Sequence, residues 1–255
     1  MASYDPEGPY AIRQFELDVL IPIEAFGLDL SFTTSAQAMV TTVILVVAFL
    51  AYSARKRTMV PGRMQAAAEA IYAFVANTVL KTAGPEARPA IPFVFSLFVF
   101  ILFGSLFGLT PVKFTFTSHL VVTLTLAFVV FTYVNVLALQ TQGLGFFRLF
   151  LPAGTPVYIA PVLLTVEVIS YLFRPITLGV RIFANILAGH IMIKLFADFC
   201  VMMIDALGGV GIGLSLFPVI MMVILYGFEI LIFLIQSYIF MLITSIYIRD
   251  SLHAH

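Results

Sequence analysis

Three charged residues recur at intervals of seven in an otherwise apolar stretch: Glu167, Arg174 and Arg181. Seven residues are close to two turns of an α-helix, so the three side chains share one stripe of a helix. Arg181 has no acid three or four positions away, and a guanidinium does not shed its proton to lower the cost of burial. Arg181 therefore needs an anion from another helix or chain.

Arg174 and Glu167 also have a plainer interpretation. Long charged side chains near the end of a membrane helix extend to the interface or form ion pairs there. For these two residues both interpretations stay open.

A second pair of titratable residues, His190 and Glu229, lies on two apolar segments joined by glycines. If the chain folds back at the Gly208–Gly209 step, positions whose numbers sum near 417 lie at one depth, and these two sum to 419. The same register places Gln236 beside Arg181. Because imidazole titrates near neutrality, the pair predicts proton exchange, although a lone histidine is more often a satisfied polar group.

Membrane helices must position these side chains. Apolar residues make up 62% of the 255 residues and charged residues 10%, and the mean hydropathy is +1.10. A hydrocarbon core of about 30 Å is crossed by about 20 apolar residues in a helix. The charge-free stretches therefore predict spans near 35–54, 91–110 and 118–140.

The stretch 162–248 is apolar throughout yet carries charges, which marks it as the functional part. It reads as two helices, 162–200 and 212–248, joined by the glycine-rich segment 205–211. A helix of roughly 38 residues is about 57 Å long, so both must be tilted or kinked, with Pro175 able to kink the first.

The segment 61–81 alternates apolar and polar residues at helical spacing, which predicts a helix lying in the interface, with Pro61 as its first residue. Basic residues flank it, so the positive-inside rule places this loop in the cytoplasm and the acidic segment 1–34 outside. The loop 141–161 and the C-terminus then lie inside. The flanking basic residues are Arg55, Lys56, Arg57, Arg63, Lys81 and Arg88.

These features predict an all-α membrane protein. We expect about five membrane helices, one interfacial amphipathic helix, and two long tilted C-terminal helices that form a hairpin. The whole chain, 1–255, forms one integral membrane domain, in which 35–140 holds the first spans and interfacial helix and 162–248 holds the long hairpin.

Several classes of function are disfavoured by the residue types. The single cysteine, Cys200, and four scattered histidines show no metal-ligand spacing, and the net charge of zero gives no sign of nucleic-acid binding. No glycine-rich phosphate loop is present, and Cys200 has no identifiable base for nucleophilic chemistry. A secondary ion-coupled transporter is the alternative, but paired repeats with broken helices are not evident.

The segment LFRPITLGVRIFANILAGH, at 172–190, resembles the signature of the ATP synthase subunit a family, in which an arginine is followed four residues later by asparagine. The likeness continues through FSLFVFILFGSLFGLTP (95–111) and FEILIFLIQSYIFMLITSIY (228–247) and covers nearly the whole chain. Many bacterial relatives have glutamate and histidine where this chain has His190 and Glu229, an exchange found in the mitochondrial type. The resemblance implies a proton path through Arg181, His190, Glu229, Glu167, Asn185 and Gln236.

The resemblance also implies the role of the chain. It would be the proton-translocating stator subunit of a rotary ATP synthase, offering two half-channels to the ring of subunit c, with no catalytic residue, metal or cofactor of its own. Its partners would be the subunit c ring, the peripheral-stalk subunit b, other ATP synthase subunits and membrane lipids. The expected location is the bacterial cytoplasmic (inner) membrane, with the mitochondrial inner membrane as alternative, and proton or sodium coupling is decided by the ring.

Two further groups are interpreted at this point. Small residues near Arg181 would let the ring approach closely; they are Gly179, Ala184, Ala188 and Gly189. Lys194 and Asp198 are expected to form an exposed, ion-paired face without a role in the proton path.

Overall fold

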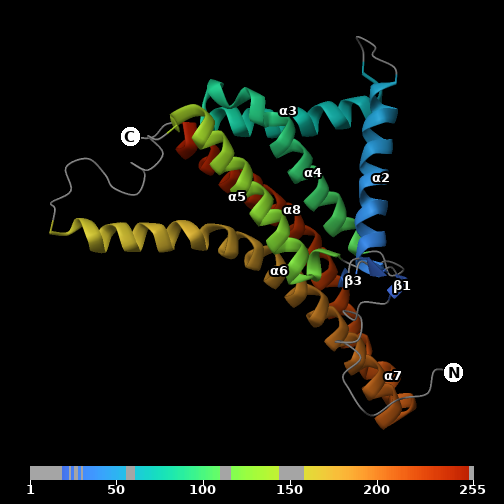
Figure 1. Cartoon of the computed structure of the whole chain (residues 1–255). Coiled ribbons are helices and arrows are strands. Elements are labelled where there is room, and N and C mark those ends of the chain that lie inside the picture. Colours follow the sequence, from blue (N-terminus) through green and yellow to red (C-terminus); the bar gives the residue numbers. More distant parts are fainter. Residues whose placement is uncertain are drawn as a thin grey trace.

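The computed structural model describes residues 19–22, 24–25, 28–29, 31–55, 61–109, 116–143 and 158–252. Within these ranges the protein consists almost entirely of helices, and five of them are long and apolar enough to cross a membrane. Figure 1 shows a bundle of crossing helices with one long arm on each of two sides. The predicted fold class is confirmed.

The first three predicted spans are present with shifts of one or two residues at their ends. They are α2 (Thr34–Ala54), α4 (Ile91–Gly108) and α5 (Leu120–Gln142). The side chain of Thr33 caps α2 by accepting a hydrogen bond of 3.4 Å from the backbone N–H of Ala36. Short 3₁₀ helices precede α4 and α5, namely η1 (Pro85–Ala90) and η2 (Phe116–Ser118).

Four short strands precede α2 and form two separate antiparallel pairs. In one pair β1 (Val19–Ile21) lies beside β4 (Phe32–Thr33), and in the other β2 (Glu24–Ala25) lies beside β3 (Leu28–Asp29). Most of the rest of the predicted outer segment 1–34 lies outside the described residues. So do Lys56 and Arg57, Pro111, and most of the predicted inner loop 141–161.

The predicted interfacial helix is α3 (Arg63–Ala83), which lies crosswise over the ends of α2 and α4 (Figure 1). It begins two residues after Pro61, because Gly62 has an extended backbone and serves as the N-cap. It ends at Gly84, whose φ of +83° is a conformation that glycine adopts without strain.

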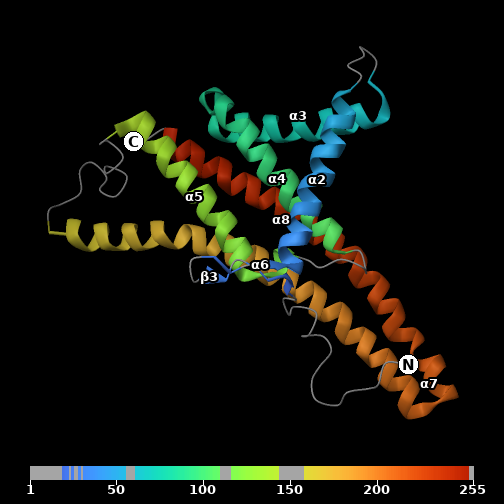
Figure 2. The ribbon, with the colours of Figure 1, turned by 45° about the vertical axis from the view of Figure 1, so that its right-hand side comes forward.

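The two C-terminal helices are longer than predicted. α6 (Ala160–Leu207) has 48 residues, about 72 Å at 1.5 Å per residue, and it contains Pro175. Both ribbon views show it bending partway along its length (Figures 1 and 2). A helix of this length cannot stand upright in the bilayer, as the sequence predicted.

The predicted linker 205–211 is mostly helical, which corrects the sequence analysis. Only Gly208, with φ +55°, breaks the helix, and α7 (Gly209–Leu214) starts at once, followed after Ser215 by α8 (Leu216–Leu252). A single glycine in the left-handed region reverses enough of the backbone direction to end one helix and start another. Gly211 is also needed at this tip, because a Cβ atom there would clash with the backbone of Met203 in α6.

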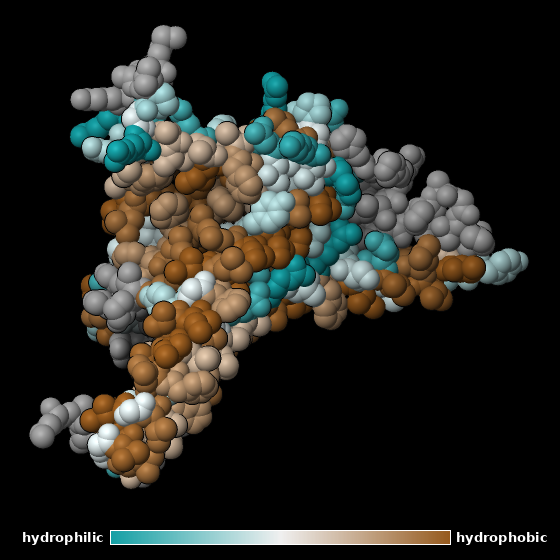
Figure 3. Space-filling model, turned by 180° about the vertical axis from the view of Figure 1, so that it is seen from behind, coloured by the Kyte–Doolittle hydropathy of each residue, from teal (hydrophilic) through white to brown (hydrophobic). Residues whose placement is uncertain are grey.

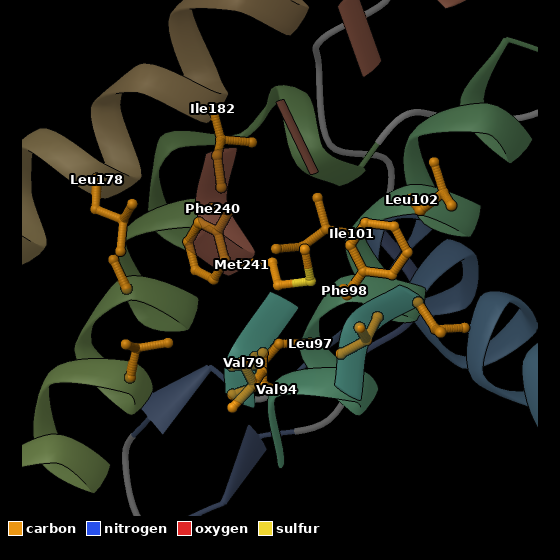
Figure 4. Packing of buried hydrophobic residues seen from close by; sticks show 14 of the residues in the cluster. Val79, Val94, Leu97, Phe98, Ile101, Leu102, Leu178, Ile182, Phe240 and Met241 are labelled. Carbon is orange, nitrogen blue, oxygen red and sulfur yellow. The ribbon is translucent and has the colours of Figure 1, made fainter. Parts of the chain in front are cut away.

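The hydrophobic core lies where α3, α4, α5, α6 and α8 meet. Figure 4 shows Val79 of α3, Phe98 and Ile101 of α4, and Ile182 of α6 converging with Phe240 of α8. In contrast, only 6% of the most apolar window of α6 is buried, against 50% for the segment of α4. The C-terminal hairpin therefore leaves most of its apolar surface uncovered by this chain.

The helix ends lie on two opposite sides of the molecule. The side chains of Thr141 and Gln142, at the end of α5, donate hydrogen bonds of 3.2 and 2.6 Å to the carbonyl of Ser251, near the end of α8. α3 lies at this same end, whereas α7 and the strands lie at the opposite end (Figure 1). This agrees with a shared side for α3 and the C-terminus; which side faces the cytoplasm stays a prediction.

Candidate functional site

His190 and Glu229 come together across α6 and α8, as their register predicted. The Nδ1 atom of His190 lies 3.3 Å from Oε1 of Glu229, and the two side chains are 14% and 2% exposed. A carboxylate is costly to bury without a partner, and the imidazole provides one. The contact brings two titratable side chains together inside the apolar hairpin.

Asn185 and Gln236 form a second contact between the same helices. The Nδ2 atom of Asn185 donates a hydrogen bond of 2.8 Å to Oε1 of Gln236, which is 3% exposed. The sequence had placed Gln236 beside Arg181, and this was wrong by about one helical turn. The two helices are not parallel, so the numbers of paired residues sum to 419 for His190–Glu229 and to 421 here.

A cavity of about 370 Å³ lies beside these two contacts. Asn185, Gly189, Glu229 and Gln236 contribute to its otherwise apolar lining. The Nε2 atom of Gln236 has no hydrogen-bond partner among the described residues, and the Glu229 carboxylate has only the close ring of His190. Buried polar atoms of this kind are usually satisfied by water, and the cavity is large enough to hold several molecules.

Arg181 is exposed on α6 and forms no ion pair or hydrogen bond with any described residue. Its guanidinium lies near enough to Tyr247 of α8 to interact with it electrostatically. The face shown in Figure 3 is largely hydrophobic and is crossed by a band of hydrophilic side chains. An exposed arginine in an apolar hairpin has the arrangement expected of a cation whose anion comes from another chain.

Arg174 has partners within the chain that the sequence analysis did not identify. Its Nη1 atom lies 3.9 Å from Oδ2 of Asp250, and its guanidinium lies 5.0 and 5.3 Å from the ring centres of Tyr171 and Tyr247. These distances suit cation–π contacts with both rings. Tyr171 lies three residues before Arg174 on the same helix, whereas Asp250 and Tyr247 are 76 and 73 residues away on α8, so the pairing of helices brings these two to Arg174. Arg174 thus has an ion pair within the chain, formed near the end of α8.

Tyr171 also ties α6 to α5. Its hydroxyl donates a hydrogen bond of 2.8 Å to Oδ1 of Asn135, whose Nδ2 donates 2.7 Å to the carbonyl of Phe131. α5, α6 and α8 are thus joined by polar contacts around Arg174.

Glu167 is half-buried near the start of α6, and the structure brings none of the other predicted site residues against it. Fourteen residues separate it from Arg181, about 21 Å along the helix. Lys194 and Asp198 were predicted to form an exposed ion pair. Both are half-buried instead and interact electrostatically, with no N–O distance within 4.0 Å.

Two of the four small residues expected to face the ring face this chain. A Cβ atom on Gly179 would lie 2.9 Å from the Cα of Leu124 in α5, and one on Gly189 would lie 2.8 Å from Oε1 of Glu229. Ala184 and Ala188 are exposed. The two glycines therefore serve packing inside the chain, which spacing along one helix did not reveal.

The helices and their polar residues define a class of protein. The chain is an all-α, multi-span membrane protein whose long hairpin buries a histidine–glutamate pair and exposes an arginine. In the ranges that the structure describes, no three His, Cys, Asp or Glu side chains gather to hold a metal ion.

Comparison with known proteins identifies the family. The family described as "ATP synthase A chain" matches residues 36–249. The protein is 46% identical over 242 residues to an ATP synthase subunit a of Mesorhizobium japonicum, covering 95% of this chain and 96% of the relative. It is 47% identical over 242 residues to that of a Chelativorans species, covering 95% and 97%, and 43% identical over 249 residues to that of Maricaulis maris, covering 95% and 96%. The chain belongs to the ATP synthase A chain family.

Proposed function

We propose that the chain is the proton-translocating stator subunit a of a rotary ATP synthase. Its relatives carry the name ATP synthase subunit a, and the family match spans most of the chain. The observation that carries the proposal is Arg181, which is exposed on an apolar hairpin without an ion partner in the described part of the chain. Its anion would be a carboxylate of the subunit c ring that turns against α6 and α8.

The outer half-channel would pass through the His190–Glu229 contact. A proton from outside is taken up at this pair, because both groups accept and release protons and the adjacent cavity gives water a place beside them. It then passes Asn185 and Gln236, which line the same cavity, and neutralises a ring carboxylate. The neutral carboxyl group can turn into the lipid at low cost, since the charge is gone.

Arg181 would separate the two half-channels. After nearly a full rotation the ring carboxyl group returns to the guanidinium, which stabilises its ionised form and so favours release of the proton. Because arginine stays protonated, it passes no proton on and blocks a direct leak between the compartments.

The inner half-channel would run along the first part of α6. Glu167 lies about 21 Å before Arg181 on this helix, toward the side predicted to be inside. Thr177, whose hydroxyl donates 3.0 Å to the carbonyl of Arg174, lies between them and is exposed. Both side chains offer polar atoms along an apolar helix.

The chain would carry out no covalent chemistry. It would transmit force while ATP is made elsewhere in the complex, and would contact the peripheral-stalk subunit b and lipid as well as the ring. The relatives described above come from bacteria, which supports the cytoplasmic membrane of a bacterium as its location.

Purification tests this function. The tagged chain should copurify with a large ATP-hydrolysing complex, and vesicles that contain this complex should pump protons when ATP is added. Vesicles from cells lacking the chain should hydrolyse ATP without pumping. A chain that catalyses ion-coupled transport alone, without the complex, would favour the secondary transporter instead.

A further inference from the structure

α6 packs closely against α5 at Gly179. A Cβ atom there would lie 2.9 Å from both Cα and Cδ2 of Leu124 and 3.0 Å from the carbonyl oxygen of Thr123. Two of these three atoms belong to the backbone, so no change of rotamer removes the clash. Gly213 and Gly227 differ, because a Cβ atom on either would meet nothing within 4 Å. The two helices can therefore cross at this distance only because position 179 has no side chain.

The crossing lies two residues before Arg181. On either side of Gly179, Leu178 and Ile182 are 2% and 0% exposed and belong to the main core, whereas Arg181 points away from that core and is exposed. A hydrogen bond between Tyr171 and Asn135 also joins α6 to α5, but Tyr171 lies eight residues before Gly179 on α6. Gly179 is thus the contact that sets the distance between α5 and the turn of helix that carries the guanidinium.

Filling this crossing would change the distance between α5 and α6. The facing turn of α5 is held in place: Thr123 is fully buried and its hydroxyl bonds to the carbonyl of Leu120, and Ala127 and Val130 lie in the core. On α6, Leu178 and Ile182 are buried in the same core. Because both helices are packed here, a side chain at position 179 would push them apart and shift Arg181 relative to α5.

We propose that Gly179 is a positioning residue for Arg181. By admitting the α5 backbone, it fixes how far α6 projects from the chain, and hence how far the guanidinium reaches toward the ring carboxylate. This inference rests on the proposed function, because the distance matters only if Arg181 acts on a group of another chain. A guanidinium stabilises a carboxylate only at the right distance from it, and displacements of about 1 Å in catalytic geometry can lower a rate about 100-fold.

The test uses the complete ATP synthase in inverted membrane vesicles. Gly179→Ala and Gly179→Val are compared with Gly213→Val, a matched control at an open helical glycine. For each variant the amount of assembled complex, ATP hydrolysis and ATP-driven proton pumping are measured. We expect the protons pumped per ATP hydrolysed to fall about twofold for Gly179→Ala and about tenfold for Gly179→Val, with no change for Gly213→Val.

A purely structural role would reduce the amount of complex and leave the ratio of pumping to hydrolysis unchanged. That result, or a wild-type ratio in an assembled Gly179→Val complex, would overturn the proposal. If Gly179→Val does not assemble, Gly179→Ala decides, and failure of both to assemble also counts against a positioning role. Arg181→Ala in the same vesicles separates the two hypotheses: if this variant pumps normally, the proposed function fails, whatever the glycine variants do.

Discussion

Arg181 and Glu229 lie on the same long hairpin, yet their side chains differ in burial and in whether they have a partner within the chain. Glu229 is 2% exposed and has the ring of His190 3.3 Å away, supplied by the facing helix. Arg181 is exposed, and the described part of the chain provides no anion for it. A charge that stays within one chain is given its partner there, whereas a charge that acts on a moving neighbour must remain available. Under the proposed function, Arg181 would meet the ring and Glu229 would serve the path leading to it.

The strongest test of this contrast removes the exposed charge. Arg181→Ala should abolish proton-driven ATP synthesis, because it removes the positive charge that the ring carboxylate would meet. Assembly should stay largely intact, because no core contact is removed. ATP synthesis and the amount of complex are measured in inverted vesicles. Undiminished synthesis would disprove the role of Arg181, and a structure of the complex with Arg181 paired inside its own chain would disprove its placement.

The next test substitutes His190 and Glu229, the buried pair, one at a time. Glu229→Gln should slow proton entry more than His190→Gln, because the carboxylate supplies both negative potential and a proton acceptor. We expect a loss of about 100-fold for Glu229→Gln, at the lower end of what a positioned acid–base group contributes. Passive proton flux and ATP synthesis are measured in reconstituted complexes. Wild-type rates with glutamine at position 229 would remove this residue from the path.

Substitution of Glu167 should have a smaller effect on proton transport if the inner half-channel has other polar groups. Glu167→Gln should lower the rate of proton release without changing the response to an outer pH step, since Glu167 would lie on the predicted inner side of Arg181. The control is Thr165→Ser at the exposed start of α6, whose hydroxyl bonds only to the carbonyl of Pro161. Equal rates for the wild type and Glu167→Gln would leave Glu167 as an interfacial side chain.

Tyr171→Phe should have the smallest effect and should leave transport unchanged. It removes one hydrogen bond to Asn135 from the polar contacts around Arg174, and a bond of this kind contributes about 1 kcal/mol to stability. The thermal unfolding of the purified complex should shift slightly downward, with ATP synthesis at the wild-type rate. Tyr158→Phe, at a 95% exposed position, is the matched control. A clear loss of proton flux would show that these contacts belong to the path.

Sequence patterns predicted most of the fold, because lipid imposes simple rules on it. Apolar stretches of about 20 residues gave α2, α4 and α5, and amphipathic spacing gave α3, since unpaired backbone groups are not tolerated in hydrocarbon. The His190–Glu229 contact also followed, because a tight hairpin fixes register close to its turn.

Contacts farther from the turn were beyond the reach of this argument. Gln236 was misplaced because the helices diverge from a parallel arrangement, and each added turn enlarges the error. Asp250 and Tyr247 were missed because their meeting with Arg174 depends on how the whole of α8 lies against α6. The inward faces of Gly179 and Gly189 depend on neighbouring helices that their own spacing does not specify.

The one-residue break at Gly208 has a consequence for biogenesis. The backbone N–H of Gly208 bonds to the carbonyl of Ile204 at 2.9 Å, and its own carbonyl accepts from the backbone N–H of Ile212 at 3.3 Å, so both backbone groups of the break itself are paired. Between Phe199 and Phe228 the only charged side chain is Asp205. Few polar side chains at this tip must cross the hydrocarbon core during insertion. The two helices can therefore insert together from one side of the membrane, with no polar loop to translocate.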